Sequence, residues 1–259
     1  MKYLLTTSNR PTKELATLAK NLSRQFNIPY KMRNIANEKL KNMEIDFIYV
    51  LDRNYQLKIQ FRDSSFFFHP STAKVRRKNI LNGQNDNLIE CMKLKGNELI
   101  LDTTFGLGSE ALLLAHYLNN GRVVGLESSI HIFRIVSHGL KHYPFKYQWI
   151  SEAATHIVLL HKNFKHFIRK ITSNSYDIVY CDPMFEVPQF RSDSINPLRY
   201  FADYEQLSRD DVKEFMRIAK KRIVLKSRTT DNLFNELDID FSYYKVSKNS
   251  GVIYGVIES

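Results

Sequence analysis

From about residue 85 onward, short and nearly continuous apolar runs alternate with amphipathic stretches of helical period. The runs span residues 98–104, 122–128, 156–162, 176–182 and 222–227. Strands that are apolar on both faces and alternate with helices indicate a parallel sheet covered by helices on each side. The chain ends in two further strand-like runs joined by KNSG (248–251), which predicts an antiparallel hairpin. We therefore expect residues 85–259 to form an α/β domain with a doubly wound, mostly parallel sheet and a C-terminal hairpin.

Residues 1–84 show a different pattern and predict a small α/β domain of their own. KYLLTT (2–7) is typical of a strand, and residues 11–26 carry apolar side chains at helical spacing. Thr12 is a candidate cap for that helix. Residues 46–61 predict a hairpin. No apolar stretch approaches the length of a membrane span, and no secretory signal is recognisable, so we expect a cytoplasmic protein with no membrane partner.

The charge of the chain favours a polyanionic partner. Lys and Arg total 38 against 27 Asp and Glu, which gives a formal net charge of +11. The positive charge is clustered at residues 74–78, 161–170 and 220–228. RNA is the expected partner, with a solvated basic surface as the alternative. The two cysteines form no C-x-x-C pair, and no acid follows His138 as in a zinc protease motif, so no metal site is expected.

A glycine-containing loop after the first strand of the larger domain predicts a nucleotide-type cofactor. Gly106 and Gly108 allow the backbone to approach a ligand closely, and a helix begins just after them. Glu127 ends the next strand, where a carboxylate can accept hydrogen bonds from a ribose diol. The spacing also fits a dinucleotide fingerprint. However, Asp102 lies four residues before Gly106, where it would repel a pyrophosphate and attract a cationic cofactor.

The stretch YCDPMF ends the fourth strand of this domain in an acid, a proline and an aromatic residue. Asp182 could accept a hydrogen bond from an amine, Pro183 fixes the direction of a backbone carbonyl, and Phe185 offers a face on which a base can stack. These three residue types together predict a clamp for the exocyclic amine of a nucleobase.

Four motifs, taken in order, carry a resemblance to a known family. LDTTFGLGSEA (101–111), HGL (138–140), VYCDPMF (179–185) and RIVLKSR (222–228) resemble the RsmJ-type small-subunit rRNA guanine-N2 methyltransferases, a class I S-adenosylmethionine-dependent family. TTSNRPT and FFFHPSTAKVRR in the N-terminal part resemble a Gram-positive branch of uncharacterised relatives. The loop after Phe185 and residues 141–155 depart from the rRNA enzymes.

The resemblance implies a Rossmann-like methyltransferase domain, S-adenosylmethionine as the methyl donor, and roles for further residues. The positions that it assigns to the cofactor are Ser109 and Glu110 near the methionine part, Glu127 and Ser128 at the ribose, Asn163 and Phe164 at the adenine, and Asp182 between cofactor and substrate. Asp102, Gly106 and Gly108 are expected to bind the cofactor from the spacing of the loop itself. From the basic clusters, the residues expected to contact RNA are His69, Lys74, Arg76, Arg77 and Lys226; for Lys226 a solvated strand-end lysine is the equal alternative.

The sequence therefore predicts an S-adenosylmethionine-dependent N-methyltransferase that acts on guanine N2 in small-subunit rRNA, with a possible RNA-binding role for residues 1–84. Two alternatives stay open. One is a methyltransferase of a protein or small-molecule amine, and the other is a catalytically silent RNA-binding relative.

Overall fold

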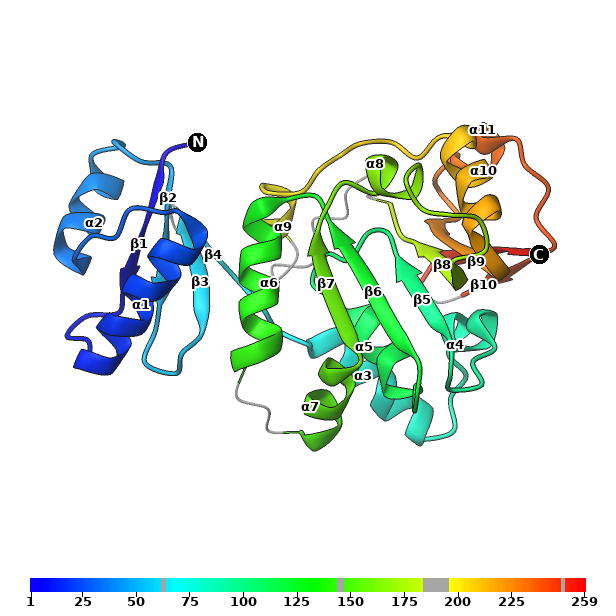
Figure 1. Ribbon diagram of the computed structural model, residues 1–259, viewed down its shortest axis with the longest axis horizontal. Coiled ribbons are helices and arrows are strands. Elements are labelled where there is room, and N and C mark those ends of the chain that lie inside the picture. The colour runs from blue at the N-terminus through cyan, green and yellow to red at the C-terminus, as the bar shows by residue number, and fades with distance from the viewer. Residues whose placement is uncertain (62–63, 144–146, 184–195, 248–249) are drawn as a thin grey trace. The chain divides into compact units, whose positions relative to one another are not determined.

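The computed structural model describes residues 1–259 except 62–63, 144–146, 184–195 and 248–249 (Figure 1). The chain divides into two compact units. Unit 1 comprises Met1–His69, Arg134–Lys146 and Ser192–Phe201, and unit 2 comprises Pro70–Phe133, Tyr147–Arg191 and Ala202–Ser259. The first boundary thus falls between His69 and Pro70, whereas the sequence pattern placed it between residues 84 and 85.

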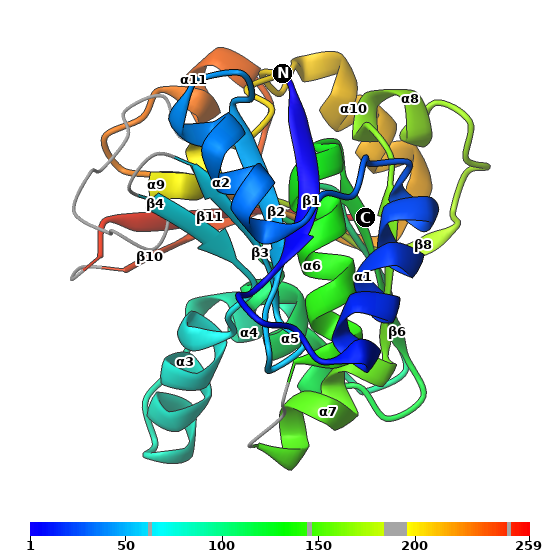
Figure 2. The same cartoon turned by 90° about the vertical axis from the view of Figure 1, so that its left-hand side faces the viewer.

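Unit 1 contains a four-stranded sheet in the order β1-β2-β3-β4. Its strands are Tyr3–Thr7 (β1), Phe47–Leu51 (β2), Leu57–Phe61 (β3) and Ser64–Phe67 (β4), which can be followed in Figure 2. β1 and β2 run parallel, while β3 is antiparallel to β2 and β4. The strand expected at residues 2–7 and the hairpin expected within 46–61 are both present.

Among the described residues, three helices belong wholly to unit 1: Lys13–Phe26 (α1), Arg33–Lys41 (α2) and Asn196–Arg199 (α9). The Thr12 hydroxyl accepts a hydrogen bond from the Leu15 backbone N–H at 3.1 Å, which confirms Thr12 as the cap of α1. Leu15, Ala19 and Leu22 form the buried stripe of α1, as their helical spacing predicted. The helix α2 was not predicted from the sequence pattern.

Unit 2 contains a seven-stranded sheet in the order β10-β11-β9-β8-β5-β6-β7. The strands are Leu99–Asp102 (β5), Arg122–Glu127 (β6), Ile157–His161 (β7), Tyr176–Cys181 (β8), Ala219–Arg228 (β9), Tyr243–Val246 (β10) and Val252–Glu258 (β11). The five strands from β9 to β7 are parallel. β11 is antiparallel to both β9 and β10. The predicted α/β class, the parallel sheet and the C-terminal hairpin are confirmed.

The helices of unit 2 are Ser71–Leu81 (α3), Asn87–Met92 (α4), Ser109–His116 (α5), Gln148–Thr155 (α7), Phe164–Ile168 (α8), Arg209–Ile218 (α10) and Leu233–Leu237 (α11); Ile130–His142 (α6) is divided between the units. α5 contacts β6 and β7, and α3 and α7 pack against α5. α10 contacts β8, β9 and α8. Residues 70–84 belong to unit 2 because α3 packs on α5.

Both faces of the parallel sheet are buried. Val179 and Cys181 of β8 pack in one core cluster with Phe215 and Ile218 of α10. The alternate residues of β8, including Tyr180, point to the opposite face and are buried as well. This explains the continuous apolar runs and leaves the carboxyl ends of the strands as the place for polar side chains. Within the described residues, no helix has the length and apolar character needed to cross a membrane.

Candidate active site

The loop that follows β5 is joined by backbone hydrogen bonds to the strands on both sides of β5. The Thr103 N–H donates to the carbonyl of Tyr180 in β8 at 2.9 Å. The Phe105 N–H donates to the carbonyl of Leu126 in β6 at 3.0 Å. The carboxyl ends of three neighbouring parallel strands are thereby fixed together, at the edge where ligands bind in open α/β sheets.

Phe105 explains why glycines are needed at positions 108 and 125. Phe105 as a residue is 4% exposed, and a Cβ added at Gly125 would lie 1.9 Å from its ring. A Cβ added at Gly108 would lie 2.4 Å from it. Gly106 and Gly108 also have positive φ angles, 53° and 71°, which glycine adopts at the lowest cost. The Phe105 ring therefore packs against the glycine loop at Gly108 and against β6 at Gly125.

Glu127 ends β6 and is held by two backbone N–H groups. Its Oε2 accepts from the Gly106 N–H at 3.0 Å, and its Oε1 accepts from the Ser129 N–H at 2.8 Å. Burial raises the pKa of Glu127 to about 7, against the lowering effect of these hydrogen bonds. Each carboxylate oxygen keeps further acceptor capacity. The predicted ribose acceptor is thus oriented before any ligand binds.

Asp102, at the end of β5, is 1% exposed. Its Oδ1 accepts a hydrogen bond from the Thr104 N–H at 3.1 Å. Burial, together with the nearby carboxylates Glu110, Asp182 and Glu127, raises the pKa of Asp102 to about 8, against the lowering effect of the Thr104 hydrogen bond. A cationic ligand beside Asp102 would stabilise the ionised form of this carboxyl group, because an opposite charge lowers the cost of ionisation.

Asp182 follows β8 and forms an ion pair with Lys226 of β9. The Lys226 Nζ lies 2.5 Å from Asp182 Oδ2 and 3.2 Å from Glu110 Oε1. The Asp182 backbone N–H donates to the Thr104 hydroxyl at 2.7 Å. Asp182 Oδ1 is buried and has no hydrogen-bond partner among the residues that the structure describes. One oxygen of this carboxylate is therefore anchored and the other is left to accept.

The ion-pair network extends from Glu110 to Arg76. The Arg76 guanidinium lies 3.3 Å from Glu110 Oε1 and makes two hydrogen bonds to Asp86, at 2.7 and 2.8 Å. Burial raises the pKa of Glu110, but the Lys226 and Arg76 cations outweigh this effect and hold it below its usual value. For Asp182, burial dominates and raises the pKa, although Lys226 lowers it.

The remaining residues assigned to the cofactor are placed as follows. Ser109 is buried at the start of α5. The Ser128 carbonyl contacts His161 Nε2 at 3.0 Å. The Asn163 side chain caps α8 by accepting from the His166 N–H, and its amide donates to Glu205 Oε2 at 2.7 Å. Phe164 is 8% exposed and belongs to the core cluster, so its ring fills the sheet core.

The basic residues expected to contact RNA are mostly engaged inside the protein. Arg76 pairs with Glu110 and Asp86 in the ion-pair network described above. Arg77 donates to His116 Nε2 at 2.9 Å, and its guanidinium lies over the Trp149 ring at 5.0 Å. Lys226 neutralises Asp182 and Glu110, so its role is neither that of a solvated lysine nor that of an exposed phosphate ligand.

Two further residues expected to contact RNA are placed differently. Lys74 lies over the Tyr147 ring at 5.1 Å. His69 belongs to unit 1, where its ring contacts Phe67 at 5.4 Å between ring centroids.

Three residues that position the site were not identified from the sequence: Thr104, Phe105 and Gly125. A glycine inside an apolar strand signals a bulge or a close approach, so RVVGLE offered a hint for Gly125. Nothing in the sequence identified Thr104 as the acceptor for the Asp182 N–H. Pro183 is part of the described chain, whereas Phe185 lies outside the described residues.

The residues present fit a cofactor that combines a cation with a ribose. Glu127 is oriented so that it could accept hydrogen bonds from a diol, Gly106 and Gly108 leave the backbone open to a ligand, and no cation of the described residues pairs with buried Asp102. No group of three His, Cys, Asp or Glu side chains within the described ranges is arranged to hold a metal ion.

Comparison with known proteins places this arrangement in context. Residues 31–250 match the family described as "Putative SAM-dependent methyltransferase". The chain is 32% identical to the uncharacterized protein YpiP of Bacillus subtilis (strain 168), over 99% of each chain. It is 27% identical to ribosomal RNA small subunit methyltransferase J of Francisella tularensis subsp. novicida (strain U112), over 57% of each chain. The solved structure of the SAM-dependent methyltransferase NGO1261 from Neisseria gonorrhoeae has a similar fold, with a TM-score of 0.64 and 15% identity over 98% of this chain and 95% of that one.

Proposed function

Because this chain belongs to the family of S-adenosylmethionine-dependent methyltransferases, we propose that it methylates the exocyclic amine of a nucleobase, guanine N2 of small-subunit rRNA. The cofactor follows from the family. The target is supported by the relative that is named as a small-subunit rRNA methyltransferase, by the formal net charge of +11, and by the geometry of Asp182.

The cofactor would be held by the ends of β5 and β6 and by the glycine loop. Glu127 would accept hydrogen bonds from the ribose hydroxyls, and Asp102 would attract the cationic part. The Gly106–Gly108 backbone would lie against the methionine part, and Asn163, which follows β7, would flank the adenine, whereas the Phe164 ring is taken up by the sheet core. When bound, S-adenosylmethionine supplies an electrophilic methyl group, so the protein mainly has to align the acceptor amine with it.

The observation that carries the proposal is the orientation of the Asp182 carboxylate. Lys226 holds Oδ2, and Oδ1 lacks a hydrogen-bond partner among the described residues. A guanine amine would donate one hydrogen bond to Oδ1 and the other to the Pro183 carbonyl. These bonds would localise the nitrogen lone pair, which is otherwise delocalised into the ring. Because burial raises the pKa of Asp182, its Oδ1 would also accept the proton that the methylated amine has to lose.

The base has to leave its stack to reach this position, which costs a few kcal/mol. Stacking on Phe185 would offset part of that cost. This role for Phe185 remains a prediction from the sequence.

Asp182→Asn tests the proposal, because the amide retains the size of the side chain but loses the negative charge. Methyl transfer from radiolabelled cofactor to rRNA, to small ribosomal subunits and to a protein fraction should identify RNA as the acceptor. The variant should turn over about a hundredfold or more slowly, while calorimetry shows cofactor binding largely retained.

Asp177→Asn is the matched control. Asp177 lies on the same strand and pairs with Lys221 at 3.2 Å, away from the amine. Near-normal turnover in Asp182→Asn would remove the amine clamp from the mechanism. Labelling of protein alone would replace RNA with a protein amine as the substrate.

A further inference from the structure

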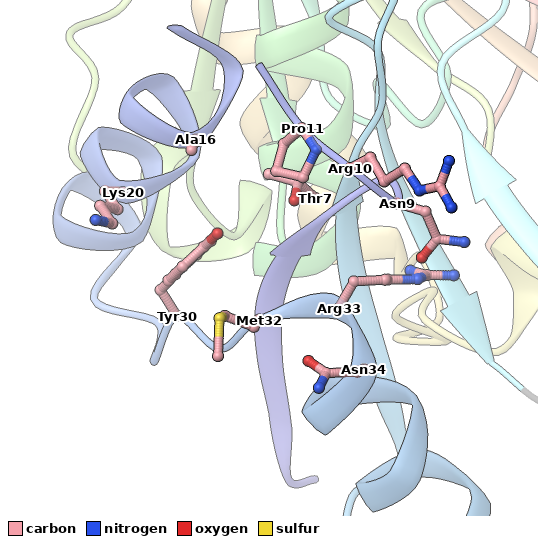
Figure 3. A pocket seen from close by; sticks show the side chains of 10 residues that line it. All are labelled: Thr7, Asn9, Arg10, Pro11, Ala16, Lys20, Tyr30, Met32, Arg33 and Asn34. Carbon is pink, nitrogen blue, oxygen red and sulfur yellow. The ribbon is translucent and has the colours of Figure 1, made fainter. Parts of the chain in front are cut away.

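A cavity of about 850 Å³ lies within unit 1, far from Asp182 in sequence and lined entirely by residues of that unit (Figure 3). It is formed where β1 ends and α2 begins, with one side of α1 as a further wall. The lining residues are Thr7, Asn9, Arg10, Pro11, Ala16, Lys20, Tyr30, Met32, Arg33 and Asn34. The volume is in the range of small-molecule sites.

The charges that line the cavity all have one sign. Arg10, Lys20 and Arg33 are cationic, and no acidic residue lines it. Within the described part of the chain, none of the three forms an ion pair. Figure 3 shows the Asn9, Arg10 and Arg33 side chains gathered on one side, with Lys20 and Tyr30 on the other. Three cations without a counterion around one space favour an anionic ligand.

Arg33 supplies an independent observation. Its Nη2 donates to Gln60 Oε1 at 2.8 Å, whereas its Nη1 is buried and has no hydrogen-bond partner among the described residues. Burial lowers the pKa of Arg33, and no carboxylate offsets this effect. A buried donor without an acceptor costs free energy; Nη1 has no accessible surface as the side chain lies, so an anion in the cavity would remove that cost only after the guanidinium turns toward it.

The N-terminus of α2 also favours an anion in this cavity. Met32 is the N-cap residue of this nine-residue helix and makes no side-chain capping bond. The free N–H groups of a helix N-terminus favour an anion. Arg33 and Asn34 are the first residues of α2 and line the cavity themselves. Charge, hydrogen bonding and the helix end thus favour the same kind of ligand.

We propose that this cavity binds a nucleotide of the RNA substrate, with its backbone phosphate between Arg10, Lys20 and Arg33. The space exceeds what a bare phosphate needs, and Tyr30 and Met32 offer apolar faces against which a base can pack. The proposal rests on the proposed function only for the identity of the RNA; the cavity itself requires only a phosphate ester.

The test measures the binding of a short, fluorescently labelled single-stranded RNA to the full chain by anisotropy, over a series of salt concentrations. Arg10→Gln combined with Lys20→Gln changes two exposed side chains and should leave the fold intact. We expect affinity about tenfold lower or more and a plot of log affinity against log salt that is flatter by about 0.7, the value for one phosphate of a single strand.

Two further variants sharpen the test. Arg33→Gln should weaken binding similarly, because it removes the charge of a half-buried guanidinium that lines the cavity. Lys41→Gln, at the exposed far end of the same helix, removes one charge of unit 1 outside the cavity and should change the salt slope little. Competition with inorganic phosphate and with adenosine monophosphate separates an RNA nucleotide from a small phosphate ligand.

Reduced RNA affinity in both cavity variants, with the Lys41 control unchanged, supports the proposal. Equal affinity and salt slope in all proteins overturns it, as does a cavity that responds to free phosphate compounds but not to RNA. Failure of the wild-type chain to methylate an RNA that it binds through these residues would overturn the proposed function and leave the cavity assignment standing.

Discussion

Removing the Lys226 cation should have consequences for both stability and turnover, and their size follows from two distances. Lys226 Nζ lies 2.5 Å from Asp182 Oδ2 and 3.2 Å from Glu110 Oε1. At an effective dielectric constant of about 20, unit charges at these separations attract by about 7 and about 5 kcal/mol. Glu110 keeps Arg76 as a second partner, so Lys226→Met mainly leaves Asp182 without a counterion. Breaking a buried pair in this way costs about 3–5 kcal/mol.

The pH dependence of that cost distinguishes an electrostatic effect from loss of packing. Without Lys226, the buried Asp182 can avoid carrying an unpaired negative charge by binding a proton. Protonation costs about 1.4 kcal/mol for each pH unit above the ordinary pKa of this group, which is 3.8. The loss of folding stability caused by the unpaired Asp182 charge therefore cannot exceed about 4 kcal/mol at pH 7 and about 2 kcal/mol at pH 5. A carboxyl with a raised folded-state pKa loses stability as pH rises above its unfolded pKa. The variant should therefore be closest to wild type in acid and differ most near neutral pH.

Chemical denaturation of both proteins between about pH 5 and 8 measures this difference. In turnover assays, the proposed hydrogen-bond acceptor would be protonated at neutral pH in the variant, so its activity should fall and its pH profile should move upward. Lys221→Met is the control: it lies on the same strand and pairs with Asp177 at 3.2 Å and with buried Glu98 at 3.6 Å, but it is itself 41% exposed. Because Glu98 keeps the Lys95 and Gly96 N–H groups as donors, we expect a smaller loss than for Lys226→Met, with little dependence on pH. A constant stability loss at every pH, with an unchanged activity profile, would refute the electrostatic reasoning.

Two further predictions concern the cofactor side of the site. Gly125→Ala would place a Cβ 1.9 Å from the Phe105 ring, so it should destabilise the fold by about 1–3 kcal/mol and weaken cofactor binding. Adding Phe105→Leu to this variant should restore part of the stability, measured by thermal melts, and part of the cofactor affinity, measured by calorimetry. Because burial raises the pKa of Asp102 to about 8, binding of the cationic cofactor should release the proton of Asp102, so the cofactor affinity measured by calorimetry should rise from about pH 6 to 8. Asp102→Asn should flatten that rise, and an unchanged dependence of affinity on pH in this variant would exclude Asp102 as the titrating group.

The sequence predicted well those features that depend on short-range pattern. Continuous apolar runs identified the parallel strands because both faces of the sheet are buried. Asp102, Glu127 and Asp182 were recognised because each is a polar residue at the point where such a run stops. Strand order then brings these three ends together, since β5 lies between β6 and β8.

The partners of the charged residues could not be predicted in the same way. Arg76 and Glu110 are 34 positions apart in the sequence, and Lys226 and Glu110 are 116 apart. A cluster such as KVRRK therefore has the same composition whether its arginines face RNA or neutralise buried acids. The structure shows Arg76 in the second role, so the positive charge of residues 74–78 overstates what is available for phosphate binding.

The distribution of charge divides the site into two halves with different chemical preferences. Asp182 and Glu110 already have Lys226 between them, so a second cation gains little there, and a neutral amine can donate to Asp182 Oδ1 without displacing the ion pair. Among the described residues Asp102 has no such cation, and burial makes its negative charge costly. A positively charged cofactor on the Asp102 side would lower that cost, while a neutral acceptor on the Asp182 side preserves the existing pairing. The network around Lys226 thus favours an arrangement in which the charged donor and the uncharged amine approach from different strand ends.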